Sequence, residues 1–249
     1  MRETNLVIIG KSGIGKSSLL NYLLDKDVAE TGSGEPVTKQ GFHLHTCIFN
    51  EQKLNIYDSW GIEAGKTEVW MSDFEQFLNL KESSTEVRKW IHRVIICISA
   101  EGKRIEEFEK RILNKLREKS LSPVIVITKS DLDQSGNFYD SVCNEFKEYE
   151  VIKVCSVEKS VGLGISKKSS KKMGREVLLS VIDKNTAKSM KIRVLNYREN
   201  YIKERRRNFE SFFSGWIDKI IFGHKGQFNL LGNIGEDCVK SILKDVDGI

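Results

Sequence analysis

A glycine-rich stretch near the start of the chain, GKSGIGKS at residues 10–17, carries residue types that can hold a phosphate chain. Its glycines let backbone N–H groups approach an anion, because a Cβ at those positions would block the approach or forbid the dihedrals. Lys16 can neutralise the β- and γ-phosphates, and the hydroxyl of Ser17 can bind Mg²⁺. The stretch matches the pattern G-x-x-x-x-G-K-[ST] between an apolar run and a helical one. We expect the nucleotide contacts to be Gly10, Ser12, Gly13, Ile14, Gly15, Lys16, Ser17 and Ser18.

A second pattern, D-x-x-G, is formed by Asp58 and Gly61 where the apolar run LNIYD ends. A carboxylate at a strand end can hold a water bound to Mg²⁺, and the glycine N–H can reach the γ-phosphate. We therefore expect Asp58 to join Ser17 at the metal and Gly61 to contact the nucleotide.

A threonine that closes over Mg²⁺ and the γ-phosphate is sought in the polar, glycine-bearing stretch ETGSGEPVTKQG at residues 30–41. Such a loop is long enough to order and disorder with the γ-phosphate. We prefer Thr38 as this catalytic and metal-binding residue, with Thr31 and Thr46 as competitors.

The sequence TKSD at residues 128–131 follows the apolar run PVIVI and bears on which base is bound. Asp131 can accept two hydrogen bonds from the N1–H and the exocyclic amine of guanine, a pairing that adenine cannot offer. The stem of Lys129 can pack over the base plane, next to Thr128. After the last strand, a backbone N–H at Ser156 or Val157 can meet the guanine O6. The nucleotide predicted from these residues is GTP or GDP.

The elements that must position these residues alternate between apolar strand-like runs and helical patterns. This alternation predicts an α/β fold with a doubly wound, mostly parallel six-stranded sheet. The second and third runs are joined by only the four residues NEQK, so we expect a hairpin and one antiparallel edge strand. The expected strands are 5–9, 44–49, 54–58, 93–99, 123–128 and 151–156, and the expected helices are 16–25, about 70–90, 104–119, about 138–148 and 174–185. The Gly-, Ser- and Lys-rich segment 160–172 reads as a mobile surface loop.

Composition bounds the class of protein. The chain has 249 residues, 39% of them hydrophobic and 30% charged, which suits one main domain with an extension. Five scattered cysteines without a C-x-x-C pair suggest neither disulfides nor a zinc site, and we expect a cytoplasmic location. We find no signal peptide, and no apolar run approaches the roughly 18 residues of a membrane-spanning helix. A net charge of +5, clustered at 167–172 and 203–207, weakly favours an anionic partner.

From the glycine loop through about Asn185 the chain resembles the P-loop GTPases of the translation-factor superclass. The stretch GKSGIGKSSL is similar to the loop of septins and immunity-associated GTPases. The stretches YDSWGIE, HRVIICISAEGKRIEEFE, VIVITKSDL and GREVLLSVI look closer to Era-like or 50S-ribosome-binding-type GTPase domains. The resemblance implies GTP and Mg²⁺ binding, slow hydrolysis and a conformational readout by two switch loops.

Departures from that family pattern bear on hydrolysis. Ile62 stands where Ras-like proteins carry a glutamine that orients water, and an apolar side chain cannot do this. Glu63 is acidic beside a triphosphate and is a poor candidate base. Gly13 replaces the Asn of potassium-stimulated relatives, and Thr128 replaces the commoner Asn, which predicts modest affinity. We expect low intrinsic turnover, with an activator, a dimer partner across the nucleotide or a target surface supplying the missing group.

Residues 186–249 form a separate, helical C-terminal extension to a GTPase domain at 1–185. It carries one apolar helical face behind the basic residues Lys203, Arg205, Arg206 and Arg207. The face can pack on the GTPase domain, on a neighbouring helix such as that expected at 236–246, or on a protein partner, while an anionic membrane surface and RNA are weaker alternatives. The residues of this face are Phe209, Phe212, Phe213, Trp216, Ile217, Ile220 and Ile221.

Three functions fit these residues. The first is a regulatory GTPase whose helical tail is its output. The second is a GTP-dependent dimerisation or scaffold module that barely hydrolyses, which Ile62 favours. The third is a P-loop kinase or ATPase, in which case TKSD would be a coincidence.

Overall fold

The computed structural model describes residues 3–27, 40–84, 86–161 and 168–217 and contains a six-stranded sheet in the order β2-β3-β1-β4-β5-β6. Strand β2 pairs antiparallel with β3, and the other neighbours pair in parallel. This confirms the predicted α/β class, the six strands and the antiparallel edge hairpin. The sheet strands are β1 (Glu3–Ile9), β2 (Phe42–Phe49), β3 (Gln52–Ser59), β4 (Arg93–Ser99), β5 (Pro123–Thr128) and β6 (Glu150–Lys153). The helices are α1 (Lys16–Leu24), α2 (Thr67–Glu82), α3 (Glu107–Glu118), α4 (Asn137–Glu145) and α5 (Arg175–Ile217), with 3₁₀ turns η1 (Val87–Lys89) and η2 (Ser130–Leu132).

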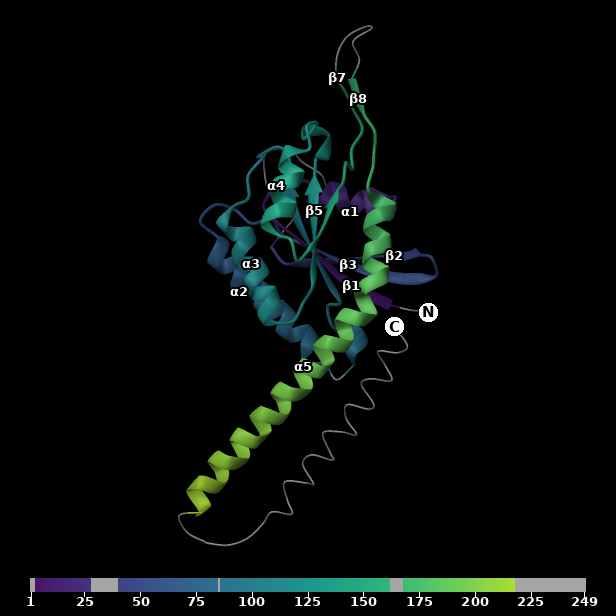
Figure 1. The fold of residues 1–249 in the computed structure, drawn as a ribbon. Coiled ribbons are helices and arrows are strands. Elements are labelled where there is room, and N and C mark those ends of the chain that lie inside the picture. Colours follow the sequence, from purple (N-terminus) through teal and green to yellow (C-terminus); the bar gives the residue numbers. More distant parts are fainter. Residues whose placement is uncertain (1–2, 28–39, 85, 162–167, 218–249) are drawn as a thin grey trace.

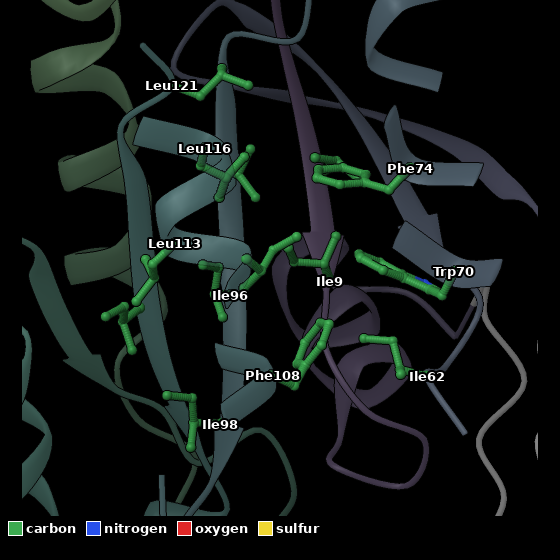
Figure 2. Close-up of a cluster of buried hydrophobic side chains, with 14 of the residues drawn as sticks. Ile9, Ile62, Trp70, Phe74, Ile96, Ile98, Phe108, Leu113, Leu116 and Leu121 are labelled. Atoms are coloured by element: carbon green, nitrogen blue, oxygen red, sulfur yellow. The ribbon is translucent and has the colours of Figure 1, made fainter. Parts of the chain in front are cut away.

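Helices cover both faces of the sheet, which is why the central strands are apolar on both sides (Figure 1). On one face, Ile9 and Ile96 pack with aromatic side chains of α2 and α3, such as Trp70 and Phe108 (Figure 2). On the opposite face, alternate residues of the same strands pack against α1 and the start of α5. Burying each such large apolar side chain contributes about 2 kcal/mol, so this double core fixes the strand register.

The carboxyl ends of the parallel strands lie at one edge of the sheet. The glycine loop follows β1, Asp58 lies near the end of β3, and Thr128 ends β5. Because β1 pairs with β3 and β4, and β4 pairs with β5, these three positions are brought to the same edge. The fold therefore gathers motifs that are far apart in the sequence.

The prediction of a mobile surface loop at 160–172 was wrong for the described part of this segment, which contains strand residues. Strands β7 (Lys159–Val161) and β8 (Lys168–Ser170) form an antiparallel pair that projects from the body (Figure 1). At its base, the backbone groups of Cys155 and Met173 exchange two hydrogen bonds of 3.1 and 2.9 Å. Main-chain pairing begun at this bridge outweighs the weak strand preference of Ser and Lys. Residues 162–167 lie outside the described part.

Helix α5 is much longer than the predicted helix at 174–185. It runs without a break over 43 residues, across the expected domain boundary at residue 186, and extends away from the sheet (Figure 1). The sequence KNTAKS at 184–189 holds neither glycine nor proline, so nothing there stops a helix. The division at residue 186 stays a prediction. The side chains of 208–217 and all of 218–249, including Ile220 and Ile221, lie outside the described residues.

The middle of α5 is fixed to the body by a buried ion pair. The guanidinium of Arg193, whose side chain is 5% exposed, contacts the carboxylate of Glu82 at the end of α2. Arg193 also donates to the carbonyl oxygen of Ile91 and lies over the Trp90 ring, 5.2 Å from its centroid. A small apolar cluster of Val87, Trp90, Met190 and Val194 surrounds this contact. Part of α5 beyond residue 186 therefore packs on the sheet domain.

Replacing Glu82 with Gln should destabilise the fold strongly. The variant leaves the Arg193 charge buried without its carboxylate, and breaking a buried ion pair from one side costs about 3 kcal/mol. The measurement is urea unfolding of the variant and the wild type at one pH. Glu68→Gln is the control, since the Glu68 side chain is 77% exposed and pairs with Arg111 at the surface. Equal midpoints for the wild type and both variants would contradict the buried pair.

Candidate nucleotide-binding site

The glycine loop joins β1 to α1 in a conformation that requires its glycines. A Cβ on Gly10 would lie 2.4 Å from Ile14 Cδ1 and 2.8 Å from the Cys97 carbonyl oxygen. Gly13 and Gly15 have φ values of 74° and 98°, in the left-handed region that other residues seldom adopt. Helix α1 begins directly after Gly15, so its N-terminus faces the loop.

Lys16 lies inside this loop rather than in solvent. It is 6% exposed, and its Nζ donates a 2.9 Å hydrogen bond to the carbonyl oxygen of Lys11 on the opposite side of the loop. Burial lowers the pKa of Lys16, while the nearby Asp58 raises it. The ammonium is thereby held where a phosphate chain lying along the loop would meet it.

Asp58 is the most informative side chain of the site. It is 2% exposed, and its Oδ1 is buried without a hydrogen-bond partner among the described residues. Burial raises the pKa of Asp58 to about 6, although Lys16, His43 and a hydrogen bond from Ser17 lower it. A buried carboxylate oxygen beside a serine hydroxyl is the oxygen-only donor set that Mg²⁺ prefers. The residues present therefore fit the predicted metal.

Of the three candidate switch threonines, the structure excludes Thr46. Thr38 and Thr31 both lie outside the described residues, so their roles stay predictions. Thr46 lies on β2 opposite Asn55, and its hydroxyl makes a 3.0 Å hydrogen bond to the Asn55 side chain. Its partner Asn55 lies three residues before Asp58 on β3, so the Thr46 hydroxyl is bonded within the β2–β3 pair and does not compete for the metal.

The D-x-x-G segment is pressed against the glycine loop. A Cβ on Gly61 would lie 2.7 Å from the Cα of Ser12, so only glycine fits there. The Ser12 N–H donates to the Ile62 carbonyl oxygen at 3.0 Å, and the Ile62 N–H donates to the Gly10 carbonyl oxygen at 3.3 Å. The two motifs thus form one backbone unit, in which movement of one displaces the other.

The side chain of Ile62 points away from the phosphate site. It is 4% exposed and packs in the core beside Trp70 and Phe108 (Figure 2). Its neighbour Glu63 is engaged in a 2.6 Å ion pair with Lys66. Neither residue is placed to orient a nucleophilic water, as expected from the sequence.

The predicted base-recognition residues gather at the end of β5. The Thr128 hydroxyl donates to the carbonyl oxygen of Ile14, which ties this strand to the glycine loop. Asp131 lies in η2, where the thiol of Cys155 donates to its Oδ1 at 3.4 Å. Burial, and then the Asp131 carboxylate, raise the pKa of the Cys155 thiol, so it keeps the proton that it donates. No motif of the sequence predicts this contact; the one feature that points to it is that Cys155 lies at the end of the last strand-like run.

A cavity of about 410 Å³ lies between α1, with the residues that follow it, and the segment after the last sheet strand. Ser18 from the glycine-loop side and Ser156 and Val157 from the last strand, all predicted contacts, share its wall. The other lining residues are Asn21, Tyr22, Asp25, Lys26, Asp27 and Lys172. The glycine loop and the base-recognition residues are thus neighbours through the Thr128–Ile14 contact, whereas Thr38 lies outside the described residues.

Thr128→Val tests the tie between the strand and the glycine loop. Valine keeps the shape but removes the hydroxyl donor to Ile14, so we expect GDP affinity to fall roughly fivefold, the worth of about 1 kcal/mol. Thr46→Val is the matched control, because it removes a threonine hydroxyl that bonds only within β2–β3. Fluorescent GDP titration measures both. Equal affinities for Thr128→Val and the wild type would show that the tie does not support binding.

The family model of the 50S ribosome-binding GTPase matches residues 5–129, which is half of the chain, spans the phosphate and metal motifs, and ends inside TKSD before Asp131. The chain belongs to this GTPase family. Membership confirms the resemblance seen in the sequence, and it favours a guanine nucleotide over the ligands of a P-loop kinase or ATPase.

Individual relatives of this GTPase domain are distant. Cell division control protein 10 of Saccharomyces cerevisiae is 27% identical over 175 residues, which cover 59% of this chain and 53% of that protein. The probable GTP-binding protein EngB of Oenococcus oeni is 30% identical over 135 residues, covering 54% of this chain and 65% of EngB. The chain therefore spans less than two thirds of the length of either relative.

Among solved structures, the fold is similar to Era in complex with MgGDPNP and nucleotides 1506–1542 of 16S ribosomal RNA. The TM-score is 0.53 at 20% identity, covering 74% of this chain and 57% of Era. At this identity the likeness concerns the fold alone. Within the described part of this GTPase chain, none of the helices has the length and apolar character needed to cross a membrane.

Proposed function

We propose that this protein binds GTP and GDP with Mg²⁺ and hydrolyses GTP slowly, as a regulatory switch. The observation that carries the proposal is the buried Asp58 carboxylate oxygen, which has no hydrogen-bond partner in the described chain and lies beside Lys16 and Ser17. Leaving a buried carboxylate oxygen unpaired is costly, and a bound cation removes the cost. Family membership and the position of Asp131 support guanine as the base.

Different residues of the chain are proposed to bind the phosphates, the metal and the base of the nucleotide. Backbone N–H groups at residues 13–18 and the N-terminus of α1 bind the phosphates, and Lys16 neutralises their terminal charge. Ser17 and Asp58, joined by Thr38 in our proposal, hold Mg²⁺, which when bound offsets charge on the β- and γ-phosphates. The Gly61 N–H is proposed to sense the γ-phosphate, with Asp131, Ser156 and Val157 around the guanine.

Slow hydrolysis is proposed because the position after D-x-x-G faces the core. Ile62 is buried and Glu63 is paired with Lys66, so neither orients the attacking water. The same feature favours the second candidate, a GTP-dependent dimerisation or scaffold module, in which a second copy across the nucleotide face supplies the missing group. The two candidates differ in turnover and not in binding.

The proposed output passes along α2 to α5. Helix α2 begins six residues after Gly61, and its last residue, Glu82, is ion-paired with Arg193 in the middle of α5. A shift of the D-x-x-G segment would therefore reach α5 through a packed contact. We propose a protein partner for the helical extension, with RNA or an anionic membrane surface as weaker candidates drawn from its basic residues.

We propose a cytoplasmic location, as expected from the scattered cysteines of the sequence.

Phosphate release with Mg²⁺ tests the proposed function. We expect slow multiple-turnover release from GTP and none from ATP. A rate per molecule that rises with protein concentration would support activation by a second copy. Tight GTP binding without turnover would favour the scaffold module. Release from ATP as fast as from GTP would contradict both.

A further inference from the structure

The segment that follows β4, residues 100–106, lies directly beside the base-recognition motif. Ser99 pairs with Thr128 in the β4–β5 register, and the Ala100 N–H donates to the Thr128 carbonyl oxygen at 3.0 Å. Beyond this hydrogen bond, Glu101 follows Ala100 after the end of β4, and Lys129 follows Thr128 after the end of β5. The sheet therefore brings an acidic side chain, which no motif of the sequence includes, against the lysine of TKSD.

Glu101 and Lys129 form an ion pair between Lys129 Nζ and Glu101 Oε2. The Lys129 side chain is 28% exposed and that of Glu101 is 63% exposed, so the lysine is the more enclosed partner. The backbone of Lys129 has φ 51°, in the left-handed region, and this fixes the direction in which its side chain leaves the chain. The lysine stem is thus held at the backbone by the turn and at the ammonium by Glu101.

A second acidic residue keeps this segment in place. Glu106 pairs with Lys11 of the glycine loop and is also the N-cap of α3 in a capping box with Glu109. The Glu106 N–H donates to the Glu109 carboxylate at 2.8 Å. Residues 100–106 are therefore anchored at both ends, and Glu101 projects from a fixed support.

We propose that Glu101 is a positioning residue for the guanine nucleotide, holding the aliphatic stem of Lys129 across the face of the base. This inference rests on the proposed function. A free lysine must give up much of its side-chain freedom when a base packs on its stem. Ordering the stem beforehand removes part of that cost and so strengthens binding.

The sign of the effect separates positioning from simple electrostatics. Removing a negative charge near an anionic nucleotide should tighten binding if only the local field mattered. If Glu101 orders the lysine stem, Glu101→Ala should instead weaken GDP binding, by about twofold to fivefold. The loss should be equal for GDP and IDP, because the stem contacts the ring face that guanine and hypoxanthine share. Asp131, by contrast, reads the exocyclic amine that hypoxanthine lacks.

The experiment measures Kd for GDP and IDP, with Mg²⁺, for the wild type, Glu101→Ala, Glu101→Gln and Glu148→Ala. Glu148 is the matched control, since its side chain is also 63% exposed and pairs with Arg117 away from the site. We expect Glu101→Gln, which retains a hydrogen-bond acceptor, to recover part of the affinity. We expect Glu148→Ala to bind like the wild type, and unfolding midpoints without nucleotide to be equal for all four proteins.

A Lys129→Met background completes the test, because methionine keeps an apolar stem but has no ammonium for Glu101 to hold. There, adding Glu101→Ala should change the Kd for GDP no further. The inference would be overturned if Glu101→Ala bound GDP as tightly as the wild type or more tightly. It would also be overturned if Glu101→Ala lost as much GDP affinity in the Lys129→Met background as in the wild type. Either result would leave the proposed function intact. A wild-type protein that binds no GDP would overturn the proposed function as well.

Discussion

Asp131→Asn is expected to exchange the base preference of the protein from guanine to xanthine. The carboxylate can accept from both the N1–H and the exocyclic amine of guanine, whereas an asparagine amide would place a donor against that amine. Xanthine has a carbonyl at this position, which the amide can bond. A buried polar mismatch of this kind costs about 3 kcal/mol, so GDP affinity should fall by roughly 100-fold and XDP binding should appear.

Competition between fluorescent GDP and unlabelled XDP measures this exchange directly. Asp140→Asn is a suitable control, because Asp140 is an exposed residue of the neighbouring helix α4. It makes the same chemical change outside the site and should leave the preference for GDP intact. Should Asp131→Asn keep the GDP affinity of the wild type, Asp131 does not read the base.

Lys16→Ala is expected to abolish triphosphate binding, with a loss of at least about 100-fold for GTP. The ammonium is enclosed by the glycine loop and held by the Lys11 carbonyl oxygen, where a phosphate chain lying along the loop would meet it. The loss should be largest for GTP, smaller for GDP and smallest for GMP, because Lys16 faces the terminal phosphates. This graded order distinguishes a phosphate contact from general disruption of the pocket.

Titration with the three guanine nucleotides gives the order, and thermal unfolding without nucleotide shows whether the variant is folded. Lys53→Ala serves as the control, since Lys53 pairs with Glu3 on the strands and its side chain is 43% exposed. A folded Lys16→Ala protein that retains tight GTP binding would argue against the glycine loop as the phosphate site.

Much of the fold could be predicted from the sequence because its signals are local. The runs around Ile8 and Ile125 are apolar on both faces, which only a strand covered by helices on each side can satisfy. The glycine loop carries its own conformational requirement, and the short turn after Phe49 forces an antiparallel pair. Each of these inferences needs only neighbouring residues.

The unpredicted features depend on contacts between distant residues. No helix breaker stops α5 at residue 185, and its packing on the sheet domain beyond that point depends on Arg193 and Glu82, which lie 111 positions apart in the chain. The β7–β8 pair depends on the backbone bridge between Cys155 and Met173. The Ser- and Lys-rich composition of the segment between them gives no sign of strand pairing. The contacts of Asp131 with the Cys155 thiol and of Lys129 with Glu101 likewise span 24 and 28 positions. No local pattern reports such pairs.

The most direct test of the central claim is an equilibrium titration of the wild-type protein with GDP and with ADP in the presence of Mg²⁺. A guanine-nucleotide protein built on Lys16, Asp58 and Asp131 should bind GDP at least about 100-fold more tightly than ADP, a difference of about 3 kcal/mol. GDP affinity should also drop when Mg²⁺ is chelated. Equal affinity for the two nucleotides, or no binding of GDP, would contradict the claim.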